Sequence, residues 1–231
     1  MPVAALLQTR VMPLALPEHL EAAIVDLDGT MVDTLGDFVA ALSAMLGDLA
    51  LPVVERPAVE RMVGKGSEHL IRAVLRHVGA PESRYEAAWA AYQSHYLEIN
   101  GRHSAVYPGV LDGLQSLRRR GLKLACLTNK PGAFARPLLR AKGLDGFFDQ
   151  VFGGDAFERK KPDPLPVRRT CEALGSKPGH TLMLGDSSND AQAARAAGCP
   201  VLLVTYGYNH GESVRAVDAD GFLDSLAQLD H

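Results

Sequence analysis

The sequence predicts an α/β protein, built as a doubly wound parallel sheet with an inserted all-helical cap domain. Short apolar runs recur along the chain without polar alternation, which is typical of parallel strands buried on both faces. Helical patterns separate the later runs, as the crossovers of a parallel sheet require. Residues 34–107, after the first run, show helical patterns and no convincing strand.

Five runs are predicted to be strands of the sheet. Each is short and rich in Val, Ile or Leu, and turn residues or helical patterns bound it. The runs are residues 22–25, 122–127, 150–152, 181–184 and 201–204. The predicted core domain therefore comprises residues 22–33 and 108–231, with an N-terminal extension over residues 1–21. Pro108-Gly109 marks the return of the chain to the core domain.

The inserted segment, residues 34–107, is predicted to form a helical cap domain. Apolar residues recur at helical spacing in three stretches, and each stretch can bury one face. Ser67 is the expected N-cap of the second helix and Gly79 its stop. The third stripe is aromatic and is interpreted as helix packing. The three stripes are Leu35, Phe38, Leu42, Met45, Leu46 and Leu49; Leu70, Ile71, Val74, Leu75 and Val78; and Tyr85, Ala88, Trp89, Tyr92 and Tyr96.

Composition excludes several classes of protein. A net charge of -3 gives no reason to expect nucleic acid or an anionic membrane as a partner. Three widely spaced cysteines argue against a disulfide framework and for a reducing compartment. No charged start leads into a clean apolar run, and no apolar stretch is long enough to span a bilayer. The expected location is therefore the cytoplasm.

Polar residues cluster where the predicted strands end, which is where ligands of open α/β sheets bind. In extended backbone Asp26 and Asp28 project to one side, and two carboxylates so close call for a metal ion or a shared proton. Gly29 permits a sharp turn whose amides can bind a phosphate oxygen. The four clusters are Asp26-Leu27-Asp28-Gly29-Thr30, Thr128-Asn129-Lys130, Lys160-Lys161-Pro162 and Gly185-Asp186-Ser187-Ser188-Asn189-Asp190.

These clusters resemble, in order and spacing, the four motifs of the haloacid dehalogenase superfamily of phosphohydrolases. Asp26 to Thr30 is similar to the first motif, Thr128 to the second, Lys161 to the third, and Asp186 with Asp190 to the fourth. The resemblance covers nearly the whole chain beyond residue 20, and the helical segment matches the cap that this superfamily inserts after its first motif.

The resemblance implies a role for each motif residue. Asp26 is expected to attack phosphorus and form an aspartyl-phosphate, and Asp28 to act as general acid and then general base. Mg²⁺ is the implied cofactor, held by Asp26, the backbone carbonyl of Asp28 and Asp186. The other implied roles are phosphate binding for Thr128 and Lys161, orientation of Lys161 or a metal-bound water for Asp190, and substrate binding for Gly29, Thr30 and Asn129.

Three alternatives compete with this assignment, two of them within the same superfamily. Asp28 argues against a dehalogenase, which needs no proton for its leaving group, whereas a phosphosugar mutase shares nucleophile, acid and metal and stays open. Bacterial receiver modules also place acidic residues, Thr or Ser and Lys at strand ends, but they have no helical cap and are about half this length. The sequence therefore favours a phosphomonoester hydrolase over a phosphorylated switch.

Further segments resemble the bacterial phosphoglycolate phosphatase family, which implies 2-phosphoglycolate as substrate. In the cap loop Gly64-Lys65-Gly66, Lys65 is expected to pair with the substrate carboxylate. The expected partner is a small phosphorylated metabolite, with no nucleic acid and no membrane, and a homodimer is left open. The segments are residues 25–34, 63–66, 160–164, 185–198 and 205–211.

Overall fold

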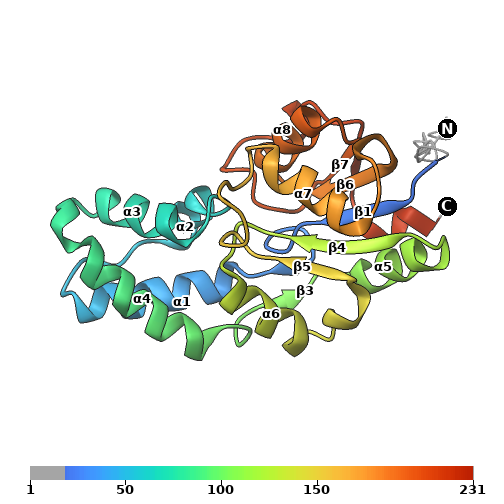
Figure 1. The fold of residues 1–231 in the computed structure, drawn as a ribbon. Coiled ribbons are helices and arrows are strands. Elements are labelled where there is room, and N and C mark those ends of the chain that lie inside the picture. Colours follow the sequence, from blue (N-terminus) through green and yellow to red (C-terminus); the bar gives the residue numbers. More distant parts are fainter. Residues whose placement is uncertain (1–18, 231) are drawn as a thin grey trace, which may run out of the picture.

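A six-stranded parallel sheet forms the centre of the molecule in the computed structural model, which describes residues 19–230 (Figure 1). The predicted N-terminal extension lies outside the described residues except for its last three positions. The strands follow the order β5-β4-β1-β6-β7-β8, so the first strand in sequence lies in the interior of the sheet. They are β1 (Ala22–Val25), β4 (Lys123–Leu127), β5 (Gln150–Phe152), β6 (Thr181–Gly185), β7 (Val201–Val204) and β8 (Gly221–Leu223).

Helices cover both faces of this sheet, which confirms the doubly wound α/β class. The side chains of β1 alternate between two apolar clusters: Ala23 and Val25 pack with α5 and α6, and Ala22 and Ile24 pack with α7 and α8. All four residues of β1 are fully buried, which explains why this run shows no polar alternation. The covering helices are α5 (Val110–Arg119), α6 (Gly132–Ala141), α7 (Leu165–Leu174) and α8 (Ser188–Ala197).

The five predicted strands are all present, three of them with the predicted bounds. A sixth strand, β8, was not predicted: its sequence Gly-Phe-Leu has two apolar side chains after a glycine, and it follows the polar stretch Asp218-Ala219-Asp220. It pairs in parallel with β7 at the sheet edge. The described residues also contain five short 3₁₀ helices: Glu82–Arg84, Asp145–Phe147, Pro178–His180, Val214–Ala216 and Leu226–Asp230.

Four helices form a separate layer beyond the carboxyl ends of the strands (Figure 1). Their shared apolar cluster contains the predicted stripes, and Tyr92 and Tyr96 are fully buried in it. The N-cap prediction for Ser67 is wrong by one position, because Gly66 is the N-cap and Ser67 begins the helix. The helices are α1 (Leu35–Asp48), α2 (Arg56–Met62), α3 (Ser67–His77) and α4 (Tyr85–Ile99), of which α2 was not predicted.

A two-stranded antiparallel ribbon connects this helical layer with the core. It pairs β2 (Val32–Asp33) with β3 (Ala105–Val106), so the chain leaves and re-enters the core at neighbouring points. The buried carboxylate of Asp37, in the first turn of α1, accepts the backbone N–H groups of Gly101 at 2.8 Å and His103 at 2.7 Å. The ribbon lies beside the predicted domain boundaries, which stay a prediction.

Two further features bear on the class of protein. Cys126, Cys171 and Cys199 are buried free thiols, so they serve as small apolar side chains of the core. Across residues 19–230, every helix falls short of the length and apolar character that crossing a membrane requires.

Candidate active site

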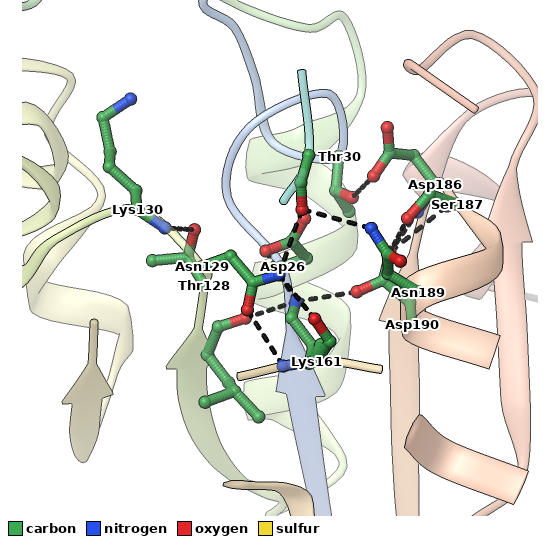
Figure 2. A network of polar contacts seen from close by, with 12 residues as sticks. Asp26, Thr30, Thr128, Asn129, Lys130, Lys161, Asp186, Ser187, Asn189 and Asp190 are labelled. Carbon is green, nitrogen blue, oxygen red and sulfur yellow. Dashed lines mark hydrogen bonds and ion pairs between the residues drawn. The ribbon is translucent and has the colours of Figure 1, made fainter. Parts of the chain in front are cut away.

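Three adjacent strands bring the central polar residues of the site together. Because β1 pairs with β4 on one side and β6 on the other, Asp26 lies between Thr128 and Asp186. All three residues follow the carboxyl ends of parallel strands, and each is at least nine-tenths buried. The motifs that the sequence separates by many residues therefore meet at one edge of the sheet (Figure 2).

Lys161 enters this cluster from the loop before α7. Its ammonium lies 2.8 Å from Asp26 Oδ1 and 2.7 Å from Asp190 Oδ1, and it donates to the carbonyl of Leu127 at 2.8 Å. The side chain is only 3% exposed. Although burial lowers the pKa of Lys161, the carboxylates of Asp190 and Asp26 raise it above its ordinary value. Lys161 is therefore a permanent cation beside the Asp26 carboxyl group.

The carboxylates outnumber this cation. Ligand oxygens of Asp26, Asp186 and Asp190 lie within 4.8 Å of one another. Burial, with the nearby Asp190 and Asp28, raises the pKa of Asp26 to about 7 despite Lys161. Burial and the charges of Asp190 and Asp26 also raise the pKa of Asp186 well above its ordinary value. A group of buried carboxylates with raised pKa values is an environment that a divalent cation relieves.

The donor set fits a hard cation such as Mg²⁺. Asp26 Oδ1 accepts no well-directed hydrogen bond from the described residues, although the Lys161 ammonium is close, so it is available as a ligand. Asp186 is held in place by two donors, the backbone N–H of Tyr208 at 2.6 Å and the Thr30 hydroxyl at 3.2 Å. Carboxylate oxygens are the ligands that Mg²⁺ prefers.

Asp190 is already occupied as a hydrogen-bond acceptor. Its Oδ1 accepts from Lys161, and its Oδ2 accepts from the hydroxyl and N–H of Ser187 at 2.8 and 3.2 Å. This second contact forms the capping box that begins α8. With both oxygens engaged, Asp190 fixes the position of Lys161, in agreement with the orienting role predicted for it.

Gly29 and Thr30 contact the metal-ligand candidate rather than the cavity. Gly29 has a φ of +85°, and a Cβ at this position would lie 2.2 Å from Asp186 Oδ2. Thr30 is fully buried and donates to Asp186 Oδ1. Neither residue lines the cavity over the strand ends. The structure therefore places these two predicted substrate-binding residues behind the site, where they orient Asp186.

Asp28 forms the boundary between the cluster and the cap. Its Oδ1 accepts from the Lys130 ammonium at 2.8 Å and from the Thr34 hydroxyl at 2.7 Å. Lys130 is 3% exposed and lies over the rings of Phe38 and Tyr96, 4.4 and 4.9 Å from their centroids. The sequence analysis quoted Lys130 in the second motif without assigning it a role. Its position directly after the motif Thr-Asn was the available signal.

Asn129 spans the cap and core without a free amide hydrogen. Its Nδ2 donates to the carbonyls of Gly64 at 3.0 Å and Lys161 at 2.8 Å, and its Oδ1 accepts the N–H of Lys161 at 3.0 Å. Asn189, in α8, donates to the same Gly64 carbonyl at 3.2 Å. The predicted substrate-binding Asn129 therefore fixes the cap loop and the Lys161 backbone.

Two lysines near the site, Lys65 and Lys160, do not line the cavity. Lys65, predicted to read a substrate carboxylate, is exposed and does not line the cavity. Lys160 pairs with Glu68 at 2.7 Å, away from the buried Lys161 ammonium. The cavity is lined by Asp26, Asp28, Phe38, Val63, Gly64, Gly66, Ser67, Leu70, Thr128, Asn129, Lys130, Lys161, Asp186, Ser187, Asn189 and Asp190.

The segment after β7 contributes contacts that sequence reasoning did not assign. The Tyr208 hydroxyl accepts the N–H groups of Thr34 and Leu35 at 2.9 and 3.2 Å and donates to Asp33. His210 lies against the cap loop, and its Nε2 is 3.2 Å from Asn189 Nδ2. Residues 205–211 therefore support both the metal-ligand candidate and the start of the cap.

Comparison with known proteins agrees with this geometry. Residues 23–204 match the family model of haloacid dehalogenase-like hydrolases. The chain is 40% identical to a phosphoglycolate phosphatase of Thiobacillus denitrificans, over 92% of this chain and 95% of the relative. It is 43% identical to the plasmid phosphoglycolate phosphatase of Cupriavidus necator, over 90% of both chains. The crystal structure of a predicted phosphoglycolate phosphatase from Haemophilus somnus superposes with a TM-score of 0.88 at 31% identity, over 91% of this chain and 96% of that one.

Proposed function

The chain belongs to the haloacid dehalogenase-like hydrolases and is a phosphoric monoester hydrolase, and from this premise we propose that it converts 2-phosphoglycolate to glycolate and phosphate through an aspartyl-phosphate on Asp26. The observation that carries the proposal is the arrangement of Asp26 between Thr128 and Asp186, with the Lys161 ammonium 2.8 Å from its carboxylate. The choice of substrate is supported by the relatives at 40% and 43% identity, which are phosphoglycolate phosphatases.

In the first step an Asp26 carboxylate oxygen attacks phosphorus, and the bond from phosphorus to the ester oxygen breaks. Thr128 and Lys161 hold the non-bridging phosphate oxygens while charge is redistributed. Asp28 donates its proton to the departing oxygen of glycolate, which would otherwise leave as an alkoxide. The hydrogen bonds of Asp28 to Thr34 and Lys130 support this role, because they fix its carboxyl group at the cavity wall.

In the second step water hydrolyses the aspartyl-phosphate. Asp28, now a carboxylate, removes a proton from the attacking water, and the bond between phosphorus and Asp26 breaks. The products are free phosphate and the regenerated Asp26 carboxylate. The cap supports this step by shielding the site, because its loop residue Gly64 is bonded to Asn129 and Asn189 of the core.

Asp26, Asp186 and the backbone carbonyl of Asp28 would hold Mg²⁺. When bound, the ion supplies neutralising charge between the carboxylates and a dianionic phosphate. The fit rests on the buried acidic triad and on the raised pKa values of Asp26, which rises to about 7, and Asp186. Tyr208 and Thr30 keep the Asp186 carboxylate oriented whether or not a cation is present.

The test combines product release with detection of the intermediate. Phosphate release from 2-phosphoglycolate is measured with Mg²⁺ and with a chelator, and a rapid acid quench followed by mass spectrometry locates phosphate on the peptide containing Asp26. Asp26→Asn is expected to fold, to lose at least ~10³-fold in turnover and to carry no phosphate. More than a tenth of wild-type turnover in this variant would overturn the nucleophile assignment.

The same assay separates the hydrolase from a phosphosugar mutase. A mutase keeps its aspartyl-phosphate long enough to return it to a sugar, whereas the proposed hydrolase releases phosphate rapidly with water as the only acceptor. Slow phosphate release that a sugar phosphate suppresses would favour the mutase.

A further inference from the structure

Lys130 is a buried cation at the cavity wall, and its contact with Asp28 uses only one of its three N–H donors. Figure 2 shows its side chain pointing away from Asp26 and Lys161, toward the cap side of the strand ends. Its ammonium touches the Asp28 carboxylate at 2.8 Å and otherwise faces the rings of Phe38 and Tyr96. Burying an ammonium group is costly unless charges or hydrogen bonds compensate it. Asp28 and the two rings compensate the charge of Lys130, and the N–H donors not directed at Asp28 are available at the cavity wall for a second anion.

The position of Lys130 matches one part of the proposed substrate. Asp28 must reach the ester oxygen to protonate it, and Lys130 touches Asp28 Oδ1. In 2-phosphoglycolate a single methylene carbon separates the ester oxygen from the carboxylate. A cation beside the acid is therefore beside the place where that carboxylate must lie once the phosphate rests against Asp26.

The cap residues that line the cavity also suit an anion. Gly66 and Ser67 begin the eleven-residue helix α3 and line the cavity, so the first turn of this helix faces the same space. The N–H groups of a first helical turn carry partial positive charge. Behind Ser67, the fully buried hydroxyl of Tyr92 has no hydrogen-bond partner, although it lies near the Ser67 side chain. The cap therefore offers donors to the same cavity that Lys130 lines.

We infer that Lys130 and the first turn of α3, with the Ser67 hydroxyl, form a carboxylate subsite that selects small phosphate esters carrying an acid group on the carbon next to the ester oxygen. The inference rests on the proposed function and names the residues that would give it its substrate preference. It replaces Lys65, which is exposed and outside the cavity lining.

A cation is needed here because the substrate carboxylate enters beside another carboxylate. Asp28 lies at the same wall, and two negative charges in a buried site repel each other. Lys130 has three donors, of which one is directed at Asp28 Oδ1, so it can contact the substrate carboxylate without leaving Asp28. A phosphate ester of similar size without a carboxylate gains nothing from this arrangement.

The test compares 2-phosphoglycolate with its carboxamide analogue, which has nearly the same shape and the same phosphate group but an uncharged amide in place of the carboxylate. Lys130→Met is expected to lower kcat/KM for 2-phosphoglycolate about ten- to a hundredfold more than for the carboxamide, the size of a lost charged hydrogen bond. Ser67→Ala is expected to lower the same ratio by a smaller factor, and it carries the test if Lys130→Met does not fold. Lys177→Met, at an exposed site before β6, is the matched control and should leave the ratio unchanged.

Equal losses on both esters in Lys130→Met would overturn the subsite, because they would mean that Lys130 acts only through Asp28. A selective loss in Lys65→Met without one in Lys130→Met would also overturn it. The wild-type enzyme distinguishes failure of the proposed function from failure of the subsite. A wild-type enzyme that prefers another acid-bearing ester to 2-phosphoglycolate contradicts the proposed substrate and supports the subsite, whereas one that hydrolyses acid and carboxamide equally contradicts the subsite.

Discussion

The carbonyl oxygen of Gly64 in the cap loop accepts a hydrogen bond from the side-chain amide of Asn129 in the core, at 3.0 Å. Asn189 donates to the same oxygen at 3.2 Å, so two core residues hold one cap carbonyl. Gly64 has a φ of +107°, and a Cβ there would lie 3.0 Å from the ring of His210. The cap loop can approach the core this closely because the residue at the contact is glycine.

We expect Asn189→Ala to lower kcat/KM about two- to tenfold, because one neutral hydrogen bond of the closed form is lost. Asn129→Ala should cost more, since Asn129 also holds the backbone of Lys161 on both sides. Steady-state kinetics with saturating Mg²⁺ measure both effects. A larger loss in Asn189→Ala than in Asn129→Ala would contradict this ranking.

Asp28→Asn should keep phosphate and Mg²⁺ binding and lose ~10²- to 10⁴-fold in turnover, the usual size of general acid-base catalysis. The amide retains an oxygen for Lys130 and Thr34, so the local structure should persist. When the first step limits the rate, an aryl phosphate should lose less than an alkyl ester, because its leaving group needs no proton. An identical loss for both esters would argue against the acid role.

Removal of the metal should abolish activity, and added Mg²⁺ should restore it. A dianionic phosphate beside the carboxylates of Asp26 and Asp186 is electrostatically unfavourable without a divalent cation. Asp186→Ala should therefore require far more Mg²⁺ than the wild type, or stay inactive at any concentration. Activity against Mg²⁺ concentration, after treatment with EDTA, measures this, and full activity in metal-free buffer would exclude the ion from the mechanism.

The stability of the metal-free protein should fall as pH rises from about 4 to about 7. Burial raises the pKa of Asp26 from 3.8 to about 7, so over this range the folded protein keeps a proton that the unfolded chain has lost. Thermal unfolding in EDTA should therefore give a lower Tm at pH 7 than at pH 5. Asp26→Asn should reduce this difference, and so should saturating Mg²⁺. If the Tm of the wild type depends on pH no more than the Tm of Asp26→Asn, the raised pKa of Asp26 is refuted.

The strand ends could be predicted from the sequence because buried parallel strands are continuous apolar runs, and their topology brings Asp26, Thr128 and Asp186 together. Which lysine lies at the cavity, Lys65 or Lys130, could not be predicted from the sequence. Lys65 lies in a glycine loop of the cap and Lys130 follows the second motif, and only the structure shows that Lys130 is buried against Phe38 and Tyr96 while Lys65 is exposed. Gly29 and Thr30 were expected at the substrate, because sequence spacing does not show that they lie behind Asp186, outside the cavity lining.

The ribbon of β2 and β3 fixes the two points at which the inserted helical segment joins the core. Val32 pairs with Val106 and Asp33 with Ala105, so the ends of the inserted segment are held side by side whatever lies between them. Insertions, deletions or exchanged helices between residues 34 and 104 leave the register of all six core strands untouched. A chimera that takes this segment from a relative should therefore inherit the cap half of the substrate preference while keeping its own nucleophile, acid and Lys130.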